Sequence, residues 1–130
     1  MGKKEDTRAK DQARAQLGSI MEMVKALETG EEIDGEDAHD RIREDPLSVE
    51  VRSDWHSPGD GNDKPAEYNI LLCTGGPAVR IIGGLGEYGQ PETAELEYQD
   101  WFKPWEKYLD ATSEEDEFLL TYARQFYYGE

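Results

Sequence analysis

The chain has 130 residues, which fits one domain with its own core, so a single domain over residues 1–130 is expected. Its 30 acidic and 14 basic residues give a net charge of −16, which argues against direct binding to nucleic acid or anionic membranes. The single cysteine, Cys73, excludes an intramolecular disulfide, and the charged N-terminus and short apolar runs favour a reducing cytoplasm.

The N-terminal part of the chain predicts two helices. Over residues 8–28, apolar residues recur at spacings of three and four, which places them on one helix face: Ala13, Leu17, Ile20, Met21, Val24 and Leu27. Gly30 follows this face and is expected to end the helix. A shorter helix is predicted over residues 36–44, because Asp45 precedes Pro46 and such a residue avoids the α region.

Four strands are predicted in the middle of the chain, over residues 47–55, 68–74, 78–82 and 93–101. The first and last alternate apolar and polar residues, as half-buried strands do, whereas the second is nearly continuous in apolar residues and indicates a central position. Short links between successive strands favour antiparallel pairing of neighbours.

A C-terminal helix is predicted over residues 114–128. Ser113 and Asp116 resemble a capping box at its start, and Leu119, Tyr122, Ala123 and Phe126 share one face. The expected fold is therefore α+β: a four-stranded antiparallel meander with N-terminal and C-terminal helices packed on it.

The segment Gly84-Leu-Gly86-Glu-Tyr-Gly89 matches the dinucleotide-binding pattern G-x-G-x-x-G and follows a predicted strand. That chemistry requires a helix to begin at the glycines, and an alternating strand follows them instead. Glu87 would also repel a phosphate. We therefore expect a flexible turn and no cofactor.

Catalytic and metal sites have no convincing candidates. Cys73 would need His39 or His56 beside it to act as a nucleophile, and its apolar strand favours a role as a small core residue. The two histidines make no zinc pattern, and Asp60-Gly-Asn62-Asp63 lacks the closing glutamate of a calcium loop. We expect a protein that is not an enzyme and binds no metal.

An aromatic cluster over residues 101–108 is the first candidate binding surface. Core packing accounts for some of its rings, but Trp and Tyr are also favoured at the centres of protein interfaces. The residues singled out as a possible contact patch are Trp101, Trp105 and Tyr108.

Acidic runs form the second candidate surface. Residues 28–37 hold six acids and no base: Glu28, Glu31, Glu32, Asp34, Glu36 and Asp37. Glu95 and Glu97 are expected to share one face of a strand about 6–7 Å apart, comparable with the spacing of phosphates along nucleic acid. Acids over residues 114–117 have a structural explanation, because they stabilise the first turn of a helix.

Three segments, residues 70–81 (ILLCTGGPAVRI), 96–105 (LEYQDWFKPW) and 119–130 (LLTYARQFYYGE), resemble a family of small acidic proteins from bacteriophages and mobile elements. The resemblance covers roughly residues 10–130. It carries over no catalytic residue. It implies a setting, the cytoplasm of a bacterial host, in which small acidic anti-CRISPR and anti-restriction inhibitors occur.

Charge and resemblance together lead to one expected function and one alternative. The expected function is non-catalytic inhibition of a host nucleic-acid-handling complex, a CRISPR effector or a restriction enzyme, through a nucleic-acid-mimicking acidic surface that binds a basic protein surface. The alternative is a phage or plasmid accessory module that binds a protein through the aromatic patch. A third interpretation is that the acidity only keeps the protein soluble.

Overall fold

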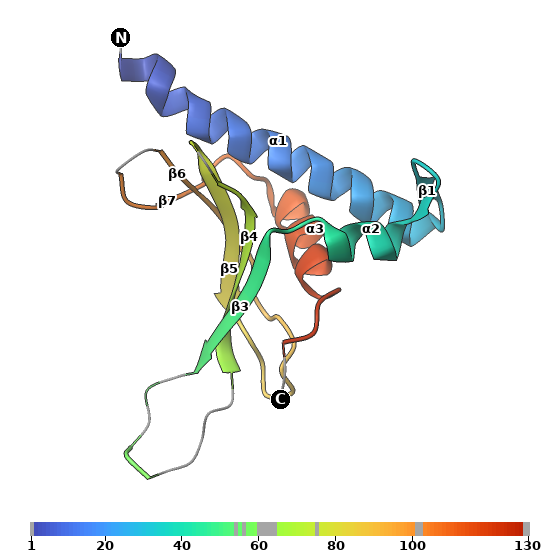
Figure 1. Ribbon diagram of the computed structural model, residues 1–130, viewed down its shortest axis with the longest axis vertical. Coiled ribbons are helices and arrows are strands. Elements are labelled where there is room, and N and C mark those ends of the chain that lie inside the picture. The colour runs from blue at the N-terminus through green and yellow to red at the C-terminus, as the bar shows by residue number, and fades with distance from the viewer. Residues whose placement is uncertain are drawn as a thin grey trace.

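In the computed structural model, α1 (Gly2–Thr29) and α3 (Ser113–Ala123) pack on one face of a five-stranded antiparallel sheet, and α2 (Ala38–Glu44) packs against α1 (Figure 1). The structure describes residues 2–53, 55, 57–59, 65–74, 76–100 and 103–128, with side chains from residue 8 onward. The sheet is a meander in which chain neighbours pair in order: β3 (Ser48–Ser53), β4 (Pro65–Cys73), β5 (Ala78–Gly84), β6 (Glu95–Gln99) and β7 (Glu106–Lys107). The predicted α+β class and antiparallel pairing are confirmed.

The predicted count of four strands in the sheet is wrong, because β7 adds a fifth. Glu97 pairs with Lys107 and Tyr98 with Glu106 in an antiparallel register. A strand of two residues shows no alternation of apolar and polar side chains, so its sequence gives no strand signal. A separate two-stranded sheet, β1 (Glu32–Ile33) and β2 (Glu36–Asp37), was likewise not predicted.

The first helix, α1 (Gly2–Thr29), packs against the sheet and against both other helices. Its buried face includes Ala13, Leu17, Ile20 and Val24, all fully buried, as the predicted spacing required. Met21 is only half-buried, and Met23 contributes to the core instead. Gly30 has a φ of 77°, the left-handed conformation that ends a helix, so the predicted stop is confirmed.

The last helix, α3 (Ser113–Ala123), begins and ends earlier than predicted. Its capping box is formed by Thr112 and Glu115, not by Ser113 and Asp116. The Thr112 hydroxyl accepts from the Glu115 N–H at 3.1 Å, and a Glu115 carboxylate oxygen accepts from the Thr112 N–H at 3.0 Å. Glutamate has the reach that this reciprocal bond needs.

Three buried tyrosines lie in the core, and the hydroxyl group of each has a hydrogen-bond partner. The hydroxyl of Tyr68 donates to the Thr93 carbonyl at 2.5 Å, that of Tyr122 to Asp45 Oδ2 at 2.7 Å, and that of Tyr128 to the Ala123 carbonyl at 2.6 Å. Each apolar ring is thus buried while its polar end has a partner. Burial raises the pKa of all three phenols.

The glycine-rich segment after β5 is a turn, as predicted, with no helix at its start. The Gly86 N–H donates to the Gln90 carbonyl at 2.7 Å, and Leu85 forms a bridge with Pro91. At the end of β5, a Cβ on Gly83 would lie 2.0 Å from the Thr93 carbonyl oxygen, so only glycine allows this approach. The segment therefore has a structural reason for its glycines.

Candidate functional site

Residues 28–37 form one local unit, the acidic hairpin, at the C-terminal end of α1 (Figure 1). Its strands β1 and β2 are joined by Asp34 and Gly35, whose φ angles are 51° and 82°. A two-residue turn with both central φ angles positive is the tight hairpin turn that Asp-Gly favours. The sequence therefore specifies a defined hairpin here.

The acidic hairpin is attached to the domain at both ends. The Thr29 hydroxyl oxygen lies 3.0 Å from the Lys25 carbonyl and 2.9 Å from Glu31 Oε1, which ties the helix end to β1. Ile33 packs against the hydrophobic core. Asp37 caps α2 (Ala38–Glu44) by accepting from the His39 N–H at 3.4 Å, so its carboxylate also has a structural role.

Among the described residues, the six carboxylates of the acidic hairpin have no ion-pair partner, although the charge of Arg41 acts on Glu36. Five are exposed and Glu36 is half-buried. The hairpin lies next to the C-terminal end of a 28-residue helix, which is the negative end of the helix dipole. The last turn of α1 holds no basic residue that would offset this negative end.

Two carboxyl groups of this region, those of Glu36 and Glu44, lie next to each other. A hydrogen bond with the Glu44 carboxyl of α2 is the main cause that raises the pKa of Glu36, and partial desolvation and the Glu44 charge add to it. Two like charges side by side disfavour ionisation of one of them. α2 adds two acids to this region together with two bases, Arg41 and Arg43, and the charge of Arg41 acts against the rise in the Glu36 pKa.

Glu95 and Glu97 lie on a different surface and are paired with bases. They share one face of β6, as predicted. Glu97 Oε1 lies 2.7 Å from Arg80 Nη2, and Glu95 Oε2 lies 3.2 Å from Lys107 Nζ. The side chain of Glu95 remains 45% exposed and that of Glu97 only 15%, so a role of these two acids in partner binding stays a prediction. The sheet neutralises these two acids, whereas the acidic hairpin leaves its own unpaired.

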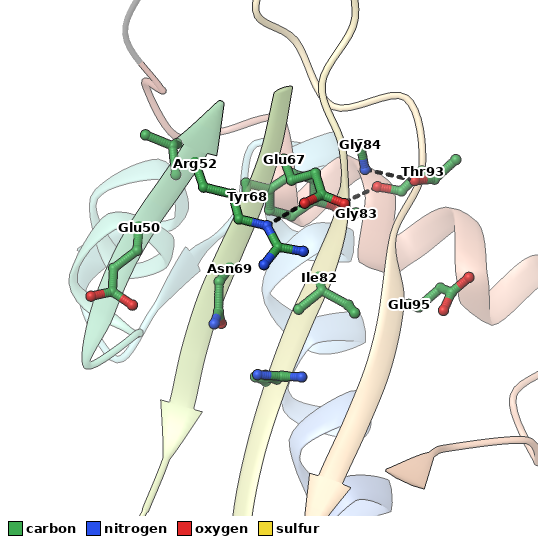
Figure 2. A pocket seen from close by; sticks show the side chains of 12 residues that line it. Glu50, Arg52, Glu67, Tyr68, Asn69, Ile82, Gly83, Gly84, Thr93 and Glu95 are labelled. Atoms are coloured by element: carbon green, nitrogen blue, oxygen red, sulfur yellow. Dashed lines mark hydrogen bonds and ion pairs between the residues drawn. The ribbon is translucent and has the colours of Figure 1, made fainter. Parts of the chain in front are cut away.

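The face of the sheet turned away from the helices holds a shallow cavity of about 550 Å³ (Figure 2). Glu50, Asn69, Ile82 and Glu95 stand in front of the strands in this view, and the helices lie behind. Arg52 and Glu67 pair across β3 and β4. Charges of both signs line the cavity, and the sequence analysis did not identify it because its residues come from four strands.

The predicted aromatic patch divides among three situations. Trp101 lies outside the described residues. Trp105 is half-buried and packs on Arg80, whose guanidinium carbon is 4.0 Å from the ring centroid. Tyr108 is buried, with 7% of its surface exposed. Neither the Trp105 ring nor the Tyr108 ring is fully exposed at the surface.

Burial raises the pKa of the Cys73 thiol, which disfavours the reactive thiolate. No group of three metal-ligating side chains gathers anywhere among the described residues, and His56 and residues 60–63 lie outside them. Across the same part of the chain, no helix combines the length and apolarity needed to cross a bilayer.

Comparisons with known proteins add no information on this site, so its function is inferred from its geometry. No family model matches the chain, and neither a curated protein nor a solved structure matches it.

Proposed function

We propose that this chain is a non-catalytic inhibitor of a host nucleic-acid-handling defence complex, of the anti-CRISPR or anti-restriction type. The acidic hairpin occupies a basic groove that otherwise holds nucleic acid. The partner is the basic surface of a CRISPR effector or a restriction enzyme, and the setting is the cytoplasm of a bacterial host.

One observation carries the proposal: several acids of the hairpin lie without an ion-pair partner at the C-terminal end of α1, where they oppose its stability. A base near the C-terminus of a helix stabilises it by about 0.3–1 kcal/mol, and an acid there has the opposite effect. Glu28 nevertheless lies in the last turn of α1 and Glu31 and Glu32 follow directly after it, whereas Asp37 stabilises α2 as its N-cap. Arrangements that oppose local stability rules are expected at functional surfaces.

The alternative function, a protein-binding module acting through the aromatic cluster, has less support. Trp105 is engaged with Arg80, and Tyr108 belongs to the core. Binding through Tyr108 would require part of the fold to open, whereas Trp105 is half-buried against Arg80. The alternative predicts that substitutions in the hairpin leave binding unchanged.

The test compares two variants of equal charge. The hairpin variant combines Glu31→Gln, Glu32→Gln and Asp34→Asn, the last chosen because Asn tolerates a positive φ. The control combines Asp11→Asn, Glu22→Gln and Glu117→Gln, three exposed acids outside the hairpin. Both lower the negative charge by three, so a difference between them reports on position and not on total charge.

Each protein is added to purified CRISPR effector complexes and restriction endonucleases, and DNA binding and cleavage are measured at low and moderate salt. The wild type and the control should inhibit at least one of these enzymes, whereas the hairpin variant should be weaker by about tenfold or more. Inhibition should weaken as salt screens the charges. Equal inhibition by the two variants, or none by the wild type, contradicts the proposal.

A further inference from the structure

Strand β3 forms an open edge of the sheet. It pairs with β4 on one side, and no described strand pairs with it on the other. Three large apolar side chains on or beside it are exposed: Leu47 at 59%, Val51 at 43% and Trp55 at 103%. An edge that combines unpaired backbone groups with exposed apolar side chains favours pairing with another strand.

The residues whose backbone groups face outward can be identified from the pairing of β4. The Leu85 N–H donates to the Ala66 carbonyl at 2.8 Å, so even-numbered residues of β4 direct their backbone groups at β5 and odd-numbered residues direct theirs at β3. Glu50 pairs with Asn69 and therefore faces inward, toward β4. Val49 and Val51 consequently present their N–H and C=O groups at the outer edge.

A second copy of this strand fits that edge in one register. In an antiparallel pair related by a two-fold axis at Val51, Val51 faces itself and Glu50 faces Arg52 of the second copy twice. These charged pairs fall at positions without backbone hydrogen bonds, where side chains of antiparallel strands come closest. Shifting the register by two residues in either direction places Glu50 opposite Glu50 or Arg52 opposite Arg52.

Apolar surface agrees with the same register. This register places the exposed Val51 side chains of the two copies opposite each other at the axis. Charge, backbone groups and exposed apolar side chains are thus all self-complementary about one axis, as a two-fold interface requires. We propose that the protein forms a homodimer by antiparallel β3–β3 pairing, which joins the two sheets into one.

The first experiment measures the oligomeric state by sedimentation velocity over roughly 5–300 µM, a range that brackets micromolar dissociation constants. The wild type should shift from monomer to dimer. Val51→Lys sets two like charges across the axis and should remain a monomer. Leu109→Lys, the same kind of change at a side chain 79% exposed outside β3, should dimerise like the wild type.

The second experiment tests the register with Glu50→Arg and Arg52→Glu. Each variant alone opposes like charges twice and should be monomeric, whereas an equimolar mixture restores opposite charges at both positions and should form a heterodimer. Recovery in the mixture also shows that both variants are folded. The proposal is overturned by a wild type that stays monomeric, by a dimer that survives Val51→Lys, or by a mixture that does not associate.

Discussion

Two glutamates show how strongly local surroundings set the behaviour of a carboxyl group in this molecule. A hydrogen bond from the Thr112 backbone is the main cause that lowers the pKa of Glu115, with Arg14 beside it at 2.9 Å. Glu36 faces another carboxyl, Glu44, and its pKa is raised. The surroundings of Glu115 therefore favour its charged form, whereas those of Glu36 favour its protonated form.

Glu36→Gln should therefore raise the melting temperature at neutral pH. A carboxyl whose folded pKa is raised contributes stability below the unfolded value, about 4.3, and that contribution is lost as pH rises through the folded value. The gain from Gln should disappear in acid, where Glu36 is protonated. Thermal unfolding followed by circular dichroism checks both, with the exposed Glu22→Gln as control. A melting temperature at neutral pH no higher than that of the wild type contradicts the expected repulsion.

Gly83→Ala should destabilise the fold by about 1–3 kcal/mol, because the new methyl group would overlap the Thr93 carbonyl. Gly18→Ala is the matched contrast. No atom lies within 4 Å of a Cβ there, so the greater helix propensity of alanine should stabilise α1 by about 0.5–1 kcal/mol. Urea unfolding measures both, and equal effects at the two sites would show that the close approach is absent.

At the scale of elements, periodic segments were predictable and short ones were not. The apolar face of α1 and the alternating strands β3 and β6 have enough residues to show a period, and β4 was indicated by its nearly continuous apolar run. Strands β1, β2 and β7, of two residues each, have no period, because pairing with a neighbour defines them. The acidic hairpin was predicted as a run of acids, but its position at the pole of α1 follows only from tertiary structure.

Thr112→Ala should cost about 1 kcal/mol, the usual value for a lost helix N-cap. Ser113→Ala should stay within about 0.5 kcal/mol, because Ser113 is exposed and does not cap the helix. Chemical denaturation of the two variants distinguishes the caps directly. A larger loss of stability for Ser113→Ala than for Thr112→Ala would instead support the capping box of Ser113 and Asp116 that the sequence predicts.

For the whole molecule, repulsion among its charges should outweigh the attraction of its ion pairs. The net charge is −16, and exposed ion pairs such as Lys10–Asp110 each contribute little. Raising sodium chloride from about 0.02 to about 0.3 M should therefore raise the melting temperature, because screening shortens the range of repulsion. A fall in melting temperature would show that the ion pairs dominate.

The partner surface is the part of this protein that the sequence could indicate only by charge. The net charge of −16 argues against a negatively charged partner, but composition does not say which acids are neutralised. Glu97 and Glu31 are the same residue type. Glu97 forms an ion pair with Arg80, whereas Glu31 lies on the acidic hairpin, where no described base forms an ion pair with it. Tertiary contacts made by a few bases decide which carboxylates remain for a partner.

The buried tyrosines give this molecule an optical signal of its own unfolding. Tyr68, Tyr122 and Tyr128 have raised pKa values, so the stability that they contribute below about 10 is lost as pH rises further. A spectrophotometric titration should therefore show a rise in tyrosinate absorbance that coincides with the loss of circular dichroism. Completion of the absorbance rise with unchanged circular dichroism would mean that these phenols reach solvent without unfolding.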